Sequence, residues 1–382
     1  MHVVVFPGWY PNKTDRLSGD FIQRHLIAIS QSCRVSVIIP VKDHTIKKAF
    51  SNKIVNGNLT ELYFYYPSVS SIRWLDNLLS FIRYNYLCVS AAAPFIKNDN
   101  ARLVHLYVLQ KNHLIGLLLQ LFYKIPFVVS EQSTLYVDGN FEKLVGLKKR
   151  MWKYVFKNAS SYHAVSLFLA DNIKNKLGLK KNGIVIPNVV DAALFYYNNQ
   201  TDKSAVTFAH VSNMSFQKNV EGMLQGFAEV KKISPNFILN LVGPMQPQTG
   251  ELINDLQLSQ QVTVWGERDY KEVAAILQQS NAFVFFTRYE TFGCVIIEAN
   301  ACGLPVIISD LEVTRELITE NFNGIFVESE NVNDLAEKIL FTMQNLKNYD
   351  PLAISVETRN KYNYQRISKQ FIDWYKRVGL AR

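Results

Sequence analysis

The chain has 382 residues and a formal net charge of +9 at pH 7, and 48% of its residues are hydrophobic. The apolar fraction excludes a disordered chain, and the length provides for two α/β domains that each bury a core of their own. The positive charge favours anionic polymers or membrane surfaces as partners, but it does not bear on the fold.

The sequence has four scattered cysteines: Cys33, Cys88, Cys294 and Cys302. They lack the paired spacing of a metal site, and a reduced compartment suits them best. The longest apolar run, 114–123, is too short to span a bilayer, and residues 2–6 are typical of a first strand rather than of a cationic leader. We therefore expect a cytoplasmic protein, soluble or peripheral on the inner face of the membrane.

The first strand, at 2–6, leads into a loop at 7–13, and Ser18-Gly19-Asp20 then begins a helix. A strand, a loop and a helix start in this order form the anion-binding first turn of a Rossmann unit. The pattern G-x-G-x-x-G is missing, so a dinucleotide cofactor is not indicated. An ordinary structural turn is the alternative for this segment.

Two amphipathic helices are predicted in the first half. Residues 71–95 combine apolar side chains with Arg73 and Arg83 at helical spacing, and the pattern favours packing on the domain over contact with a membrane. Residues 143–157 place six basic side chains around Trp152. This second helix either lies on an anionic membrane surface or packs its apolar side on the domain core with its basic side in solvent.

The remaining strands alternate with helical segments. In the first half they are predicted at 34–40, 103–107, 126–130, 162–166 and 184–186, and Glu131 and Gln132 follow the strand at 126–130. After a polar run at 197–204, strands are predicted at 206–211, 237–242, 262–265, 283–286, 306–309 and 324–326. Such alternation predicts a parallel sheet with helices on both faces, and ligands bind at the carboxyl ends of its strands.

The stretch 289–305 lies between two short apolar strands and is predicted to be the crossover of a βαβ unit. Its helix is expected at 294–303, which puts Glu290 in the loop at the strand's carboxyl end and Glu298 about one turn inside the helix. Gly293 allows a ligand to approach the backbone closely. Two carboxylates there can accept hydrogen bonds from several hydroxyls, as a sugar and a ribose offer. An ordinary turn with two solvated glutamates is the alternative.

Glu290 and Glu298 are separated by seven residues, with Thr-Phe-Gly after the first and Glu-Ala-Asn-Ala-Cys-Gly-Leu-Pro from the second onward. This wording resembles the signature of retaining glycosyltransferases of family 4. The resemblance implies the α/β fold called GT-B, in which two Rossmann-like parallel-sheet domains face a cleft. It implies an acceptor domain at 1–190, a nucleotide-sugar donor domain at 191–355 and a C-terminal helix at 356–382 that crosses back to the first domain.

The resemblance also assigns site residues, and two of them depart from the family's pattern. Gln132 stands where relatives carry a histidine that points at the transferred sugar, and Asn213 stands where they carry an arginine for the phosphates. Lys218 matches the phosphate-binding lysine, Glu298 would hold the ribose, and Glu290 would hold the donor sugar. The implied catalytic residues are Glu290 and Lys218. The implied donor site comprises Gly19, Ser212, Asn213, Lys218, Gly266, Glu290, Thr291, Phe292, Gly293, Cys294 and Glu298, with Glu131 and Gln132 on the acceptor or sugar side.

The residues and the resemblance together predict transfer of a sugar from a nucleoside diphosphate sugar to an acceptor hydroxyl, with retention, in the synthesis of a cell-envelope or polysaccharide glycan. The sequence contains no Asp-x-Asp, so we expect no metal and no cofactor besides the substrate. The expected partners are the donor, a glycan or lipid-linked acceptor and an anionic membrane surface. Nucleic acid is not expected, because no recognition motif accompanies the basic charge.

Two other functions stay open. A glycoside hydrolase also uses two carboxylates, but these flank one bond at about 5 Å or more, normally from facing elements. Glu290 and Glu298 belong to one βα unit and suit that geometry poorly. A non-catalytic protein that binds a nucleotide sugar or an anionic glycan is compatible with Gln132 and Asn213, which replace the expected histidine and arginine.

Overall fold

The computed structural model describes residues 1–199 and 205–380. Two predicted segments extend beyond these residues. Residues 200–204 of the polar run predicted between the two halves, and residues 381–382 of the predicted C-terminal helix, lie outside the described residues.

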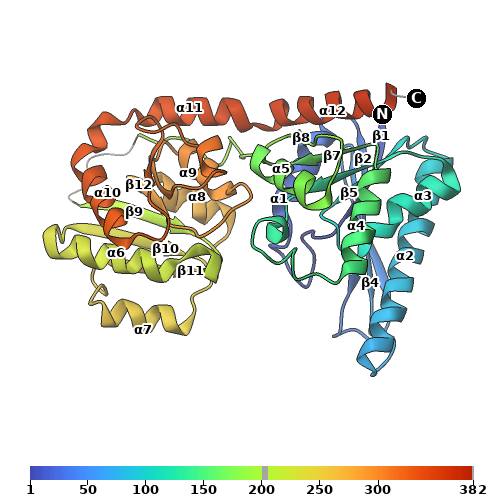
Figure 1. The fold of residues 1–382 in the computed structure, drawn as a ribbon, viewed down its shortest axis with the longest axis horizontal. Helices are drawn as coiled ribbons and strands as arrows, with labels where there is room; N and C mark the ends of the chain where they lie inside the picture. The colour runs from blue at the N-terminus through green and yellow to red at the C-terminus, as the bar shows by residue number, and fades with distance from the viewer. Residues whose placement is uncertain (200–204, 381–382) are drawn as a thin grey trace. The chain divides into compact units, whose positions relative to one another are not determined.

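The chain divides into two compact units, which Figure 1 colours along the sequence. Unit 1 comprises residues 1–189 and 364–382, and unit 2 comprises residues 190–363. The boundary predicted between 355 and 356 falls inside a continuous helix, α11 (Pro351–Tyr362), and unit 2 extends through the whole of it.

Unit 1 is built on an eight-stranded sheet with the order β3-β4-β2-β1-β5-β6-β7-β8. Its strands are β1 (His2–Pro7), β2 (Arg34–Lys42), β3 (Phe50–Asn56), β4 (Leu59–Tyr66), β5 (Leu103–Tyr107), β6 (Phe127–Glu131), β7 (Ser161–Ala164) and β8 (Ile184–Val185). Neighbouring strands are parallel except for β3, which is antiparallel to β4. The central strand β1 is buried along its whole length, as expected for a parallel sheet covered on both faces.

The β3–β4 hairpin is absent from the sequence prediction. Its turn places Gly57 at φ +58°, a conformation that glycine adopts without strain. All of β3 is exposed, whereas β4 alternates between buried and half-buried positions beside β2. Because β3 has no buried face of its own, its sequence lacks the apolar alternation that marks a strand.

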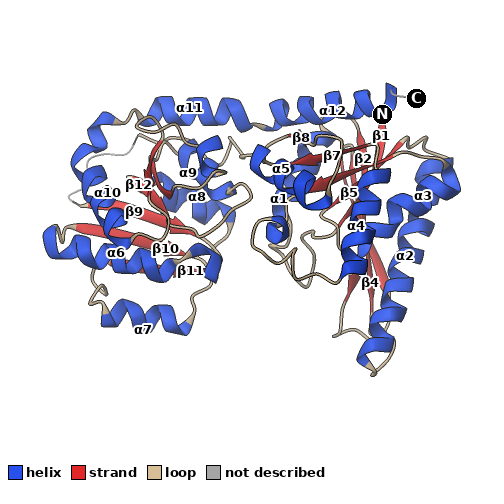
Figure 2. Ribbon diagram, in the orientation of Figure 1, coloured by secondary structure: helices blue, strands red, loops and turns tan. Residues whose placement is uncertain are grey.

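Helices of unit 1 pack around this sheet (Figure 2). They are α1 (Asp20–Ser30), α2 (Arg73–Lys97), α3 (Ile115–Tyr123), α4 (Gly146–Asn158), α5 (Leu167–Leu177) and α12 (Tyr364–Leu380), with the 3-10 helices η1 (Lys111–Leu114) and η2 (Thr134–Tyr136). Helix α12 packs against α1 and buries Phe371, Trp374 and Tyr375 in the core of unit 1. None of the helices among the described residues combines the length and the hydropathy needed to cross a membrane.

Unit 2 holds a six-stranded, fully parallel sheet with the order β11-β10-β9-β12-β13-β14. Its strands are β9 (Val206–Val211), β10 (Phe237–Val242), β11 (Val262–Gly266), β12 (Ala282–Phe285), β13 (Val306–Ser309) and β14 (Gly324–Val327). Its helices are α6 (Val220–Ile233), α7 (Pro247–Asp255), α8 (Tyr270–Gln278), α9 (Cys294–Ala301), α10 (Val332–Asn345) and α11, with η3 (Phe216–Lys218), η4 (Thr314–Glu316) and η5 (Leu346–Asn348). In Figure 2, α6 lies on one face of the sheet, and α8 and α9 lie on the other, as the alternation predicted.

The chain leaves unit 2 between α11 and α12. Asn363 is extended, with φ −71° and ψ 162°, and its side-chain amide donates to the carbonyl of Arg359 at 3.0 Å. This bond uses a carbonyl that the end of α11 leaves without a helical partner. The described part of the C-terminal helix predicted at 356–382 is therefore divided between α11 and α12.

Candidate functional site

The order of the unit 2 strands creates a topological switch point. The chain runs outward from β9 to β10 and β11 and then returns to β12 on the other side of β9. The loop after β9 (212–219) and the loop after β12 (286–293) therefore leave the same edge of the sheet in opposite directions. In open parallel sheets this is the place where ligands bind.

Lys218 and Glu290 meet at this point as an ion pair, although 72 positions separate them in the sequence. The side chains are 15% and 6% exposed, so most water is excluded from both charges. The Lys218 ammonium also lies 4.9 Å from the centre of the Phe285 ring. Gln217 donates from Nε2 to Glu290 Oε1 at 3.0 Å and to the carbonyl of Tyr289 at 2.7 Å. The two predicted catalytic residues are thus in direct contact, with an amide donor beside them.

Further hydrogen bonds tie the two loops together. The carbonyl of Gln217 accepts from the Thr287 hydroxyl at 2.9 Å and from the backbone N–H of Arg288 at 2.8 Å. The Arg288 guanidinium pairs with Glu221 at 2.7 Å and with Glu330 at 2.9 Å. Glu290 and Lys218 are therefore held by bonds that do not depend on a ligand, which is the preorganisation that a binding site requires.

Helix α9 begins four positions after Glu290, at Cys294 as predicted. Gly293 precedes it at φ +90°, where an added Cβ would lie 2.5 Å from Ile296 Cδ1. Thr291 and Phe292 are 8% and 3% exposed, so the turn is anchored in the unit. The start of a helix carries partial positive charge and attracts phosphate oxygens. Glu298, in the second turn, is 2% exposed.

The loop after β9 departs from its expected phosphate chemistry. Asn213 is exposed, and its side-chain oxygen accepts from the N–H of Ser215 at 3.2 Å. Ser212 lies against Gly243, where an added Cβ would approach the Ser212 carbonyl oxygen to 1.8 Å. Gly266 ends the edge strand β11 at φ +69° with open space where a Cβ would be. Lys218 is therefore the cation of this turn that reaches Glu290.

His210 is a residue of this region that sequence reasoning missed. Its Nδ1–H donates to the carbonyl of Val284 at 2.9 Å, so Nε2 accepts from the Ser212 hydroxyl at 2.8 Å. Burial lowers the pKa of His210 to about 4, and the imidazole is neutral. It joins β9 to β12 and orients Ser212. The signal in the sequence that could have identified it is a single histidine within an otherwise apolar strand.

The predicted residues of unit 1 have internal partners. Gly19 precedes α1 at φ +67°, and an added Cβ would lie 2.5 Å from the Trp9 carbonyl oxygen. Glu131 is 1% exposed and accepts backbone N–H groups from Leu109 at 3.2 Å and from Gln132 and Ser133 at 3.0 Å. Burial raises the pKa of Glu131 to about 7. This carboxyl organises the loop after β6.

Three buried histidines connect the strands of unit 1, and sequence reasoning missed all three. His105 accepts from the Tyr375 hydroxyl at 2.6 Å and donates to Ser130 at 2.6 Å, and Ser130 donates to His163 at 2.7 Å. The third, His25, accepts from the Gln132 amide at 3.3 Å. Burial lowers the pKa of His25 to about 3 and that of His163 to about 4, and it lowers the pKa of His105 as well. The cluster is neutral and structural.

A hollow of about 310 Å³ lies at the carboxyl ends of β1 and β2 in unit 1. Trp9 and Tyr10 from the loop after β1 line it, together with Lys42 and Lys111. Lys42 is paired with Asp76. Burial lowers the pKa of Lys111, and the nearby charge of Lys42 lowers it further. Two ammonium groups with one carboxylate make this hollow suitable for an anionic or hydroxyl-rich group.

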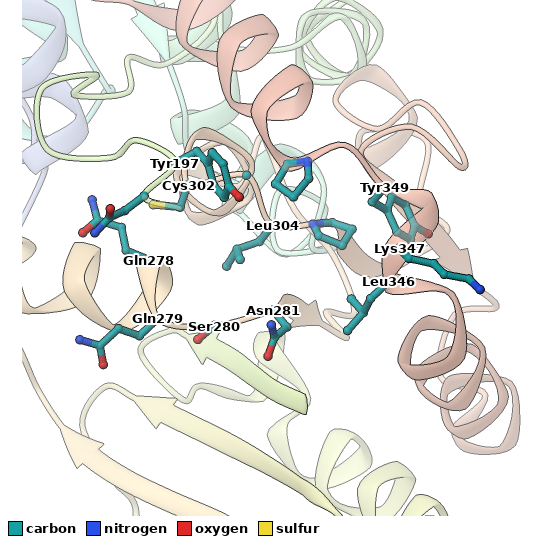
Figure 3. Close-up of a pocket in the computed structure, with 14 residues that line it drawn as sticks. Tyr197, Gln278, Gln279, Ser280, Asn281, Cys302, Leu304, Leu346, Lys347 and Tyr349 are labelled. Atoms are coloured by element: carbon teal, nitrogen blue, oxygen red, sulfur yellow. The ribbon is translucent and has the colours of Figure 1, made fainter. Parts of the chain in front are cut away.

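A larger cavity of about 460 Å³ lies in unit 2, away from the predicted residues (Figure 3). Asn281 and Pro305, which precede β12 and β13, line it together with Cys302 at the end of α9. It therefore lies at the amino ends of the strands and at the negative end of that helix, which disfavours a phosphate. Among residues 1–199 and 205–380, no group of three or more His, Cys, Asp or Glu side chains could hold a metal ion.

Residues 197–361 match the family model described as glycosyl transferases group 1. The matched segment lies within unit 2. It contains every predicted site residue of unit 2, including Lys218, Glu290 and Glu298.

Two similar proteins are glycosyltransferases by name. An uncharacterized glycosyltransferase of Methanocaldococcus jannaschii is 27% identical over 252 residues, which cover 65% of this chain and 68% of that protein. N,N'-diacetylbacillosaminyl-diphospho-undecaprenol alpha-1,3-N-acetylgalactosaminyltransferase of Campylobacter jejuni is 26% identical over 307 residues, which cover 75% of this chain and 80% of that protein. These matches support a glycosyltransferase that acts in glycan synthesis.

The fold agrees with solved structures along the whole chain. Sucrose-phosphate synthase of Thermosynechococcus elongatus superposes with a TM-score of 0.77 at 17% identity, covering 100% of both chains. HepE of Anabaena, in complex with UDP, superposes with a TM-score of 0.74 at 16% identity, covering 98% of this chain and 100% of the other. The predicted GT-B fold, with two Rossmann-like units, is confirmed.

Proposed function

We propose that this protein is a retaining glycosyltransferase of family 4 that transfers a sugar from a nucleoside diphosphate sugar to an acceptor hydroxyl. The observation that carries the proposal is the Lys218–Glu290 pair, held between the loops after β9 and β12 inside the segment that matches the group 1 family model. A cation for a diphosphate and a carboxylate for a sugar are what such a donor needs side by side.

In the reaction, the bond between the anomeric carbon and the diphosphate oxygen breaks, and a bond from that carbon to the acceptor oxygen forms on the same face. Negative charge builds on the diphosphate as it leaves, and the departing diphosphate oxygen takes the proton of the acceptor hydroxyl. The Lys218 ammonium and the start of α9 stabilise the leaving charge. Glu290 holds hydroxyls of the donor sugar and stabilises positive character at the anomeric carbon, and Glu298 holds the ribose.

The proposed reaction needs no metal, because Lys218 and the start of α9 take the part that a nucleotide-bound cation would have. The sequence offers no Asp-x-Asp to hold such a cation. We expect turnover to be retained in excess chelator. Turnover that stops with chelator and returns with Mg²⁺ would reject this part of the proposal.

The proposed acceptor is a glycan or a lipid-linked sugar, and the proposed location is the cytoplasm, at the inner face of an anionic membrane. The name of the Campylobacter jejuni relative specifies a sugar on diphospho-undecaprenol as its acceptor, which supports a lipid-linked acceptor. The hollow with Lys42 and Lys111 offers positive charge for such a diphosphate. The comparisons do not favour the alternative of a non-catalytic binding protein.

The first test is thermal stabilisation of the purified protein by UDP, GDP, ADP and their sugars. A ligand that binds only the folded state raises the melting temperature with the logarithm of its saturation. UDP is the first nucleotide to try, since the similar structure of Anabaena HepE contains it. We expect one nucleotide family to stabilise the wild type, and Lys218→Ala and Glu298→Ala to lose the shift.

The matched control is Lys232→Ala, which removes an exposed lysine of α6 in the same unit. It should keep the full shift. If no nucleotide stabilises the wild type at millimolar concentration, or if Lys218→Ala keeps the shift, the donor assignment is wrong. Release of nucleotide on addition of an acceptor then distinguishes transfer from binding alone.

A further inference from the structure

The long helix α2 presents its large apolar side chains to solvent. Trp74, Leu78, Ile82 and Tyr86 repeat every four residues and are 68%, 50%, 56% and 71% exposed. We call these four residues the α2 stripe. The buried side of the helix consists of Asp76, Ser80, Tyr84, Cys88 and Ala92.

The two sides run along opposite faces of the helix. At 100° per residue, each residue of the stripe lies about 200° around the helix from the buried residue two positions later. Apart from Tyr84, the buried residues of α2 are small or polar, whereas the large apolar residues of the stripe are exposed, unlike the usual amphipathic helix. The packing predicted for the apolar residues of 71–95 is wrong for the α2 stripe, because the unit buries the other side of α2.

The neighbouring helix α3 also exposes apolar side chains. α2 contacts α3, where Lys97 lies 5.8 Å from the centre of the Tyr123 ring. Leu121 and Phe122, at the end of α3, are each 62% exposed. The stripe alone spans about 18 Å at 1.5 Å per residue. Large contiguous apolar patches on a protein surface mark interaction sites.

The charge around the stripe is almost entirely positive. Helices α2, α3 and α4 contain eight basic residues: Arg73, Arg83, Lys97, Lys148, Lys149, Arg150, Lys153 and Lys157. Asp76 is their only acidic residue, and it is buried in an ion pair with Lys42. α3 contacts both of the other helices. The field of this part of unit 1 attracts anionic surfaces.

Trp152 of helix α4 is buried and is not available for the membrane contact that was one interpretation of residues 143–157. Trp152 is 3% exposed and Phe156 is fully buried, with the Lys148 ammonium 4.9 Å from the centre of the Trp152 ring. Its apolar side packs on the unit, which was the alternative interpretation of 143–157. Its exposed face combines Leu147 and Tyr154 with Arg150 and Lys157.

We propose that unit 1 docks on an anionic phospholipid bilayer through the α2 stripe, with the basic residues of α2 and α4 facing the lipid phosphates. This deepens the proposed function, on whose membrane partner it rests, by naming the surface. Trp74 and Tyr86 at the two ends suit the interface of a bilayer, with Leu78 and Ile82 reaching toward the acyl chains. A second copy of the chain would bring two positive faces together, which opposes self-association here.

The test uses the full chain and phosphatidylcholine vesicles with or without phosphatidylglycerol, measured by flotation. We expect binding that requires phosphatidylglycerol and weakens with salt. Changing Trp74, Leu78, Ile82 and Tyr86 together to Gln should lower the partition coefficient by about tenfold or more. The matched control changes Ile233 and Leu352 to Gln, which are 73% and 58% exposed on unit 2, and should leave binding unchanged.

Tryptophan fluorescence tests whether the stripe lies in the bilayer. The variant used changes the affinity for vesicles little. Trp74 is the most exposed of the five tryptophans, ahead of Trp265 at 38%. Vesicles of brominated phosphatidylcholine mixed with phosphatidylglycerol should quench the tryptophan fluorescence of the wild type. Trp74→Phe should still bind the vesicles but lose most of the quenching.

Three results would overturn the inference. The first is unchanged vesicle binding by the quadruple Gln variant, and the second is quenching that persists in Trp74→Phe. The third is a dimer formed by the wild type but not by the quadruple Gln variant. The nucleotide shift, measured on the same samples without vesicles, tests the donor assignment separately. Vesicle binding through the stripe by a chain that binds no nucleotide would support this inference and reject the donor site.

Discussion

Each unit buries a set of ionisable groups, and the two sets differ in charge state, being charged in unit 2 and shifted toward neutral in unit 1. In unit 2, Lys218 and Glu290 form an ion pair at the switch point between β9 and β12. In unit 1, Glu131 and the buried histidines lie among internal hydrogen-bond partners, and burial shifts their pKa values toward the neutral forms. Under the proposed function, the charged pair of unit 2 takes part in chemistry, whereas the neutral groups of unit 1 hold the unit together, and the partner of each group makes the difference.

The largest effect on this comparison is expected from the variant Glu290→Gln. We expect kcat/KM to fall by about 10²- to 10⁴-fold, because the carboxylate acts on charge that develops only in the transition state. Stabilisation by the nucleoside diphosphate alone should remain, since Lys218 is still present. Steady-state kinetics and thermal shifts measure the two effects. Glu229→Gln, on the exposed face of α6, is the control. Equal loss of nucleotide binding and turnover would contradict the assigned role.

The second prediction concerns the stability of unit 1 at acidic pH. The folded-state pKa values of His25 and His163 lie below the ordinary 6.5, so the unfolded chain binds more protons, and stability is lost as pH falls from about 6.5 toward 4. The raised pKa of Glu131 acts oppositely, since its contribution is present at low pH and is lost as pH rises through about 7. The histidines outnumber it, so unit 1 should lose on the order of a few kcal/mol between pH 7 and pH 5.

Unit 2 has one comparable group, His210, with a pKa of about 4. Hydrogen exchange at pH 7 and pH 5, corrected for intrinsic rates, reports on each unit separately. Protection should fall further in the strands of unit 1 than in those of unit 2. An equal or larger fall in unit 2 would mean that the histidine cluster does not govern acid stability.

Glu131→Gln should affect stability more than chemistry. Both carboxyl oxygens accept backbone N–H groups, and an amide would turn one acceptor into a donor that faces a donor. We expect a loss of about 1–3 kcal/mol in the free energy of unfolding, measured with urea, and a kcat within about twofold of the wild type. A large drop in kcat at unchanged stability would instead give Glu131 a part in the reaction.

The smallest expected effect is a gain. Asn213 is exposed, and the family resemblance of the sequence implies an arginine at this position. Asn213→Arg should strengthen binding of the nucleoside diphosphate by about three- to tenfold, because a second cation joins Lys218 near the diphosphate. Isothermal titration calorimetry measures the change, and Asn213→Gln serves as the uncharged control. Tighter binding by both variants would show that charge is not the cause.

Much of unit 2 was predictable because its strands are short apolar runs bounded by polar residues, glycine or proline. The predicted strands 206–211, 237–242 and 306–309 have the observed bounds. The start of α9 at Cys294 and the positions of Glu290 and Glu298 were also predicted. The β3–β4 hairpin was missed, because β3 is exposed along its whole length and carries no pattern of burial.

The sequence by itself determined the alternation of strands and helices and the loop that carries Glu290, since local periodicity and turn residues act over a few positions. Tertiary structure alone decided the contacts between distant segments. It paired Lys218 with Glu290, buried Trp152 and left Trp74 exposed. Periodicity distinguishes the two sides of a helix, but which side a sheet covers depends on where the helix packs.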